Sequence, residues 1–125
     1  MPLDWSRGAL AEGLACYRGG DFFLAHEHWE SVWLGLQEPE KGFLQGLIQV
    51  AAAFHHLQRG NVAGAVSLLQ RALRRIESRP AAFGGIAAAP LCAEVREWLR
   101  RLESGGAVNS GDFPQIRPLE QSAGS

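Results

Sequence analysis

The residues best suited to chemistry lie in one short stretch, Phe22 to Trp33, which contains two His, two Glu, two Trp and two Phe. Within it, His26, Glu30 and Trp33 follow one another at intervals of four and three residues. On a helix these intervals return to the same side, so we expect the three side chains to share one face. This face indicates a binding site, but it does not define a reaction.

His26 and Glu30 are expected to be half-buried, because apolar residues flank them on both sides of the helix. A buried carboxylate needs hydrogen-bond donors or a raised pKa, and a buried imidazole takes its tautomer from its partner. Two interpretations remain open. The pair is either a hydrogen-bonded contact that fixes helix packing, or part of a site with Trp33 as a wall. Glu27 and His28 are expected to point outward.

A second polar stripe is expected on the helix predicted over residues 40–58. The stripe consists of Gln45, Gln49, Ala52 and His56, with His55 to one side. If it faces the first stripe, the chain encloses His, Glu and Gln side chains suited to a small polar ligand or a divalent metal such as zinc. Alternatively, the two Gln side chains bond to the backbone or to each other.

The prediction therefore has a ligand-binding set and a metal-binding subset. The ligand-binding residues are His26, Glu27, Glu30, Trp33, Gln45, Gln49, His55 and His56. The candidate metal ligands are His26, Glu30 and His56.

Familiar catalytic motifs are missing from the sequence. Glu30 stands where a His-Glu-x-x-His motif needs its second His, and the chain has no Glu-x-x-His pair of the di-iron bundles. Cys16 and Cys92 have no nearby activating motif, and Ser31 is expected on the wrong side of its helix, so nucleophilic catalysis is not indicated. Whether the chain is an enzyme stays open.

Composition narrows the class of protein. The chain has 125 residues, a formal net charge of −1 and 20% charged residues, which favours one soluble domain and argues against nucleic-acid binding. The basic strip at Arg71, Arg74, Arg75 and Arg79 is more typical of a solvated face. With no apolar run of membrane length and no signal-peptide pattern, we expect a cytoplasmic protein without a membrane partner. The two Cys residues are expected to be free, buried thiols.

Helical periodicity predicts an all-α fold, a compact five-helix bundle of antiparallel hairpins. The helices are expected over residues 4–17, 21–36, 40–58, 61–77 and 90–104. The third is apolar almost all round and is therefore predicted to be central. Residues 1–104 are expected to form one helical domain. Residues 105–125 are predicted to be an extended or partly disordered tail, of which residues 113–116 can dock on the helices.

The first four helices contain an internal repeat. Gly20-Asp21-x-x-x-Ala25 and Gly60-Asn61-x-x-x-Ala65 place the same turn, cap and small residue in two hairpins. This resembles the turn of tetratricopeptide-type repeats. The alternative is that any antiparallel hairpin uses glycine, a polar cap and a small contact residue.

Several spaced motifs resemble the family called domain of unknown function 309. They are His26-Glu27-x-x-Glu30-x-x-Trp33, Leu44-Gln45-Gly46-Leu47-Ile48-Gln49, Ala51-Ala52-Ala53 with His55 and His56, Gly60-Asn61, and Gly64-Ala65. The resemblance covers residues 10–76. It implies a small all-helical prokaryotic protein whose His-x-x-x-Glu-x-x-Trp motif has been suggested to bind a metal, without an established activity. By the same resemblance, Glu27, Gln45, His55 and His56 occupy neighbouring family positions.

Two functions are therefore expected from the sequence. The first is binding of a metal or small ligand by a His/Glu site between the second and third helices. The alternative is a helical-repeat module that binds a protein or a second copy of itself, in which the His/Glu cluster is structural.

Overall fold

The computed structural model describes residues 3–105 and 112–119, and the helices confirm the predicted all-α class. Within these residues the helices are α1 (Gly8–Arg18), α2 (Phe22–Trp33), α3 (Glu40–Gln58), α4 (Val62–Glu77) and α5 (Ala88–Glu103). A small hairpin, β1 (Ala82–Phe83) and β2 (Ile86–Ala87), connects α4 to α5. None of the helices in this part of the chain is long and apolar enough to cross a membrane.

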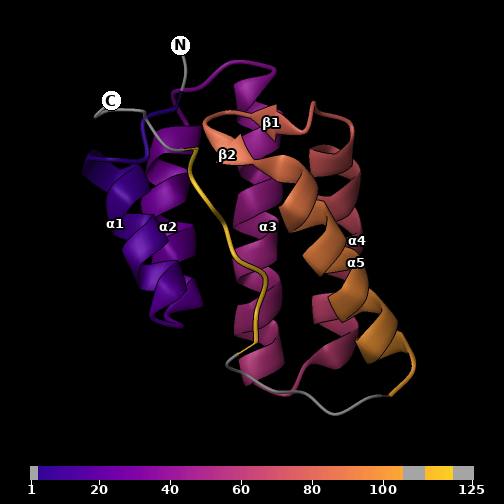
Figure 1. The fold of residues 1–125 in the computed structure, drawn as a ribbon. Coiled ribbons are helices and arrows are strands. Elements are labelled where there is room, and N and C mark those ends of the chain that lie inside the picture. Colours follow the sequence, from indigo (N-terminus) through magenta and orange to yellow (C-terminus); the bar gives the residue numbers. More distant parts are fainter. Residues whose placement is uncertain (1–2, 106–111, 120–125) are drawn as a thin grey trace.

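The helices form a curved layer around α3 (Figure 1). Helices α2 and α4 pack on either side of α3, while α1 packs on α2 and α5 packs on α4. An extended segment, residues 112–119, runs between α1 and α5 in front of α3 (Figure 1). We call this segment the strap. The side of the molecule that carries α1, the strap and α5 is the front face, and the opposite side, formed by α2, α3 and α4, is the back face.

Helix α3 is central because most of its circumference is apolar. Leu44, Leu47, Val50 and Ala51 are completely buried. Burying a large aliphatic side chain is worth about 1.5–3 kcal/mol, so the lowest free energy places this helix between its neighbours. Gly46 permits the close contact with α4, since a Cβ atom there would lie 2.9 Å from Ile76 Cγ1.

The two predicted hairpin turns are alike in structure. The Asp21 side chain accepts a hydrogen bond from the Leu24 amide, and the Asn61 side chain accepts one from the Gly64 amide. The preceding Gly20 and Gly60 have φ values of 84° and 81°, a region that favours glycine. These contacts account for the starts of α2 and α4, whereas the tetratricopeptide likeness stays a prediction.

Three predicted helix boundaries were wrong. Helix α1 begins at Gly8 instead of Asp4, because the Asp4 carboxylate accepts hydrogen bonds from Ser6 and Arg7 in a turn before the helix. These contacts lower the pKa of Asp4 to about 2. Helix α2 ends at Trp33, where a turn through Gly35 replaces the expected last helical turn. Helix α5 begins at Ala88, two residues before the predicted Pro90.

The β1–β2 hairpin was not predicted, because two-residue strands are too short to produce a sequence period. Its turn consists of Gly84 and Gly85, which have φ values of 59° and 77°. The Ala87 amide then donates to the Arg117 carbonyl, and the Leu119 amide donates to the Gly85 carbonyl. The hairpin therefore fixes the end of the strap, a contact across thirty residues of sequence.

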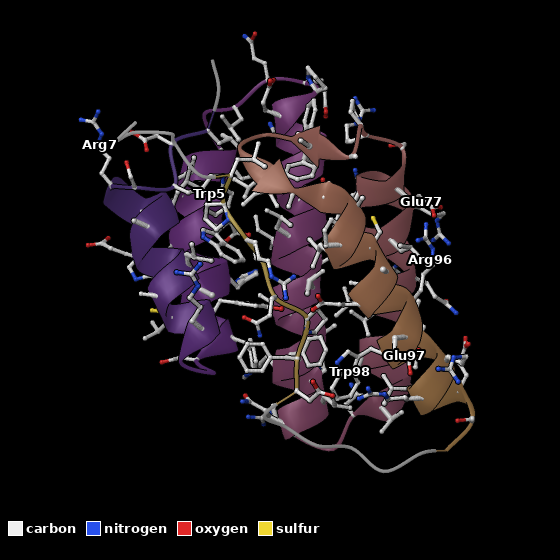
Figure 2. The ribbon with its side chains drawn as sticks, in the orientation of Figure 1. Trp5, Arg7, Glu77, Arg96, Glu97 and Trp98 are labelled. Atoms are coloured by element: carbon white, nitrogen blue, oxygen red, sulfur yellow. The ribbon has the colours of Figure 1, made fainter. Side chains whose placement is uncertain are left out.

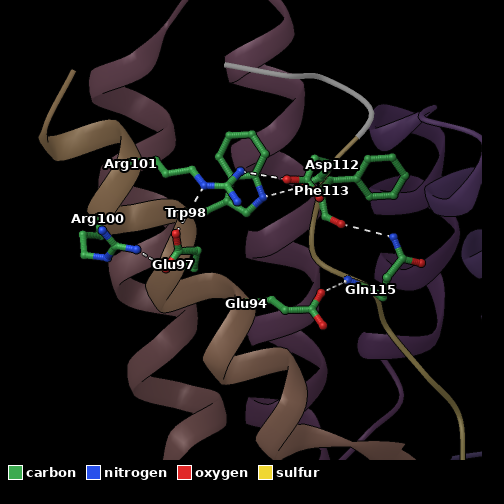
Figure 3. Close-up of polar contacts among 8 residues, drawn as sticks. All are labelled: Glu94, Glu97, Trp98, Arg100, Arg101, Asp112, Phe113 and Gln115. Carbon is green, nitrogen blue, oxygen red and sulfur yellow. Dashed lines mark hydrogen bonds and ion pairs between the residues drawn. The ribbon is translucent and has the colours of Figure 1, made fainter. Parts of the chain in front are cut away.

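The strap is held on the front face by hydrogen bonds to its backbone (Figure 3). Tyr17 Oη donates to the Pro114 carbonyl at 2.6 Å, and Trp98 Nε1 donates to the Asp112 carbonyl at 2.6 Å. Ile116 is only 2% exposed. Residues 113–116 therefore dock as expected, and the parts of the predicted tail at 106–111 and 120–125 lie outside the described residues.

Candidate functional site

Helices α2 and α3 are packed together, and their opposed directions place the start of α2 beside the end of α3. A surface hollow of about 180 Å³ lies at this end. It is lined by Phe22, Phe23, His26, Ala52, His55 and His56. Three residues of the predicted set, His26, His55 and His56, thus share one hollow, and the small side chain of Ala52 leaves space there.

The other end of the α2–α3 contact is marked by Trp33 and Lys41, since Lys41 Nζ lies 4.5 Å from the centroid of the Trp33 ring. Helical spacing places Gln45 and Gln49 of α3 between these two ends of the α2–α3 contact. Five half-buried side chains then follow one another along α3, and we call them the α3 strip: Lys41, Gln45, Gln49, Ala52 and His56. The seam is the contact of this strip with His26, Glu30 and Trp33 of α2.

His26 and Glu30 are close but not tightly bonded. His26 Nε2 lies 3.8 Å from Glu30 Oε2, beyond normal hydrogen-bond distance. The His26 side chain is 28% exposed, as expected for a half-buried group, but the Glu30 side chain is 51% exposed. Glu30 therefore lies at the rim of the seam, where solvent screens its charge. Glu27 is exposed as expected, while His28 lies 3.7 Å from Glu12 of α1.

Three buried polar atoms at the seam have no hydrogen-bond partner. Within the described residues, the buried side-chain nitrogens and oxygens without a partner are His26 Nδ1, Trp33 Nε1 and Gln49 Oε1. Such a group costs about 1–3 kcal/mol of folding free energy, which is why proteins rarely retain one without a reason. All three belong to the residues predicted to bind a ligand.

The other tryptophans behave differently from Trp33. Trp5 Nε1 donates to the Gly84 carbonyl at 2.8 Å, and Trp29 Nε1 donates to the Leu10 carbonyl at 3.2 Å. Trp98 lies on α5 (Figure 2), and its Nε1 donates to the Asp112 carbonyl of the strap (Figure 3). The fold therefore satisfies three of its four indole groups with backbone carbonyls, and the exception lies at the seam.

The structure gives no support for a metal ion at the seam. No group of three or more His, Cys, Asp or Glu side chains in residues 3–105 and 112–119 is arranged to hold one. The predicted ligands His26, Glu30 and His56 are thus not assembled. His56 Nδ1 lies 3.1 Å from the Asn61 side-chain amide. The Phe23 ring packs against two imidazoles, with centroids 6.3 Å from His26 and 5.4 Å from His55.

Cysteine chemistry does not contribute to the seam either. Cys16 and Cys92 are both free, as predicted, with Cys16 half-buried and Cys92 buried. Burial raises the pKa of the Cys92 thiol, which disfavours the reactive thiolate.

The sequence analysis missed Phe23 of the hollow and Lys41 of the seam. Phe23 lines the hollow although it is 49% exposed, and nothing in the periodicity distinguishes such a residue from any surface phenylalanine. Lys41 had a detectable signal, because it precedes Gln45 by four residues and so continues the same stripe.

The fold and the seam define a small helical domain with a half-buried polar strip between α2 and α3. Residues 10–68 match the family model described as "Domain of unknown function (DUF309)", which is the family that the sequence motifs suggested. The matched range contains all of α2 and α3 and thus the whole seam.

One similar protein is an uncharacterized protein of Aquifex aeolicus (strain VF5). It is 34% identical over 109 residues, which are 86% of this chain but 31% of the relative. The chain therefore spans about a third of the length of this relative. Neither the family description nor the name of the relative states an activity.

Proposed function

We propose that this chain binds a small polar ligand at the seam between α2 and α3. The observation that carries the proposal is the set of three unpartnered buried atoms, His26 Nδ1, Trp33 Nε1 and Gln49 Oε1. An indole nitrogen only donates and an amide oxygen only accepts, whereas the imidazole nitrogen does either according to its tautomer. A ligand that carries both donors and acceptors complements this set.

The surroundings support a ligand that is small and partly apolar. The hollow beside His26 has a volume of about 180 Å³, and its walls include the rings of Phe22 and Phe23. Ligand sites in proteins commonly combine such apolar walls with a few polar groups that fix orientation. A metal ion is not proposed, since the histidines are not arranged around a common point.

Native mass spectrometry of the full chain, purified without an affinity tag, tests the proposal directly. We expect a bound mass beyond that of the polypeptide, or binding from a library of small polar compounds measured by the rise in melting temperature. Gln49→Met keeps the volume of the side chain but removes the acceptor, and it should abolish this binding. Gln70→Met on α4 is the matched control, because Gln70 is exposed and its amide donates to Glu103 of α5, away from the seam.

The alternative, in which the His/Glu cluster only stabilises the fold, predicts a different pattern. In that case Gln49→Met would lower the melting temperature of the free protein, because it would break an internal hydrogen bond. A less stable Gln49→Met protein, together with no bound mass and no compound that raises the melting temperature, would rule out the ligand site.

A further inference from the structure

On the back face, acidic and basic residues lie mostly on different helices. Helix α2 has two acidic residues, Glu27 and Glu30, and no Lys or Arg. Helix α4 has three arginines and one glutamate. The two helices lie on opposite sides of α3, so the back face has an acidic edge and a basic edge.

Within the described part of the chain, the arginines of α5 and the strap are paired, whereas the three arginines of α4 are not. Every arginine of α5, and Arg117 of the strap, lies within 4.0 Å of a carboxylate. On α4, the exposed Arg71, Arg74 and Arg75 have no ion-pair partner among the described residues. Helix α3 keeps them apart from the carboxylates of α2.

Exposed apolar side chains accompany the unpaired acidic residues. Phe23, Glu27, Glu30 and Leu34 follow at intervals of four, three and four residues, so they form one stripe along α2. Phe23 is 49% exposed and Leu34 is 70% exposed, which are high values for large apolar residues. A surface stripe that combines apolar and charged groups is typical of an interface.

We propose that two copies of this chain form a dimer through their back faces, with a two-fold axis parallel to α3. This axis places α2 of one copy opposite α4 of the other, so acidic and basic edges meet twice. A two-fold axis perpendicular to α3 within the interface would instead place α2 against α2, where like charges repel. The charge pattern thus selects one of two symmetric arrangements.

The register along the helices agrees with this arrangement. Helices α2 and α4 start after equivalent turns at Asp21 and Asn61 and run in the same direction beside α3. Phe23 of α2 lies beside His55 of α3, and Ile76 of α4 lies beside Gly46 of α3. Counting along these antiparallel helices, Glu30 is level with Arg74 of the other copy, one turn from Arg71. The half-buried α3 strip lies between the two α2–α4 contacts and is enclosed by the dimer.

Sedimentation velocity of the full chain at micromolar concentration tests the dimer. We expect a dimer at low salt and a larger monomer fraction at about 1 M salt, where ion pairs are screened. Glu30→Arg and Arg71→Glu should each raise the dissociation constant about tenfold or more, because each reversal creates two repulsive contacts in a symmetric dimer. Arg18→Glu on α1 is a control, since Arg18 is exposed and lies away from the back face.

Mixing the two single variants gives the sharpest result. In a mixed dimer, one contact joins the native Glu30 to the native Arg71, and the other joins the two reversed residues. Equimolar Glu30→Arg and Arg71→Glu chains should therefore associate with each other better than either does with itself. Circular dichroism spectra identical to that of the parent would show that both variants fold. A monomeric parent at low salt, a dimer unchanged by both reversals, or failure of the mixed pair would overturn the proposal.

Discussion

Among the described residues, buried polar groups have hydrogen-bond partners within the chain on the front face, and they lack such partners at the seam on the back face. On the front face, Tyr17 Oη and Trp98 Nε1 each donate to a carbonyl of the strap. At the seam, Trp33 Nε1 has the same chemistry as Trp98 Nε1 and no partner at all. Trp98 is 2% exposed and Trp33 is half-buried, but the Trp33 indole nitrogen is itself buried and has no access to solvent.

The difference separates groups that stabilise this fold from groups that are held ready for another molecule. An internally bonded polar group contributes to stability only while its partner stays in place, whereas an unpartnered one lowers stability until a ligand binds. Substitutions should therefore destabilise the front face and leave the seam unchanged or more stable. Each prediction below tests this contrast.

Ile116→Ala in the strap should have the largest effect. The side chain is 2% exposed and belongs to the hydrophobic core, so its truncation should lower the free energy of unfolding by about 2–5 kcal/mol. Chemical denaturation monitored by circular dichroism measures this value. A loss below about 1 kcal/mol would mean that the strap is only loosely attached, and the contrast with the seam would fail.

Tyr17→Phe should cost about 1–3 kcal/mol, because it leaves the buried Pro114 carbonyl without its donor. The pH dependence provides a second measurement. Burial, with a smaller contribution from Glu94, raises the pKa of Tyr17 well above its ordinary value of 10.0. The neutral Tyr17 phenol therefore makes its full contribution to the free energy of unfolding below pH 10. This contribution is lost as pH rises through the folded-state pKa. Urea denaturation between pH 8 and pH 11 should show this loss in the parent, and a smaller one in Tyr17→Phe.

Trp98→Phe and Trp33→Phe form a matched pair, since the same atoms are removed from each face. Trp98→Phe should lower the free energy of unfolding by about 1–3 kcal/mol, because the Asp112 carbonyl loses its donor. Trp33→Phe removes an atom without a partner and should cost clearly less. Equal losses in parallel urea titrations would show that Trp33 Nε1 is bonded in solution, and the ligand proposal would lose its main support.

Most of the helical framework could be predicted from the sequence, because its determinants are local. The cap residues Asp21 and Asn61 and the apolar circumference of α3 placed α3, α4 and the start of α2 almost to the residue. The start of α1 was missed because Asp4 makes a turn with its immediate neighbours instead of capping the helix. The β1–β2 hairpin depends on contacts with the distant strap, which no local pattern encodes.

For the candidate site, periodicity identified which residues share a face but not how their atoms are oriented. It placed His26, Gln49 and His56 near one another, and the hollow and the α3 strip agree with that placement. It did not show that His56 turns to Asn61, or that Phe23 packs against His26 and His55. Side-chain orientation depends on such tertiary contacts, so the metal-binding subset could not be judged before the structure.

Gln49→Met should have the smallest effect on the free energy of unfolding, and it should raise this free energy instead of lowering it. If Gln49 Oε1 has no partner in the free protein, replacing it with an apolar group of similar volume removes a desolvation cost, and stability should rise by about 1 kcal/mol. Functional sites commonly retain residues that lower stability, so a gain here together with lost ligand binding is the pattern expected of a site. Thermal and urea denaturation of the ligand-free protein show whether the substitution raises or lowers stability. A clear loss of stability would mean that Gln49 is bonded within the chain, and the seam would then resemble the front face.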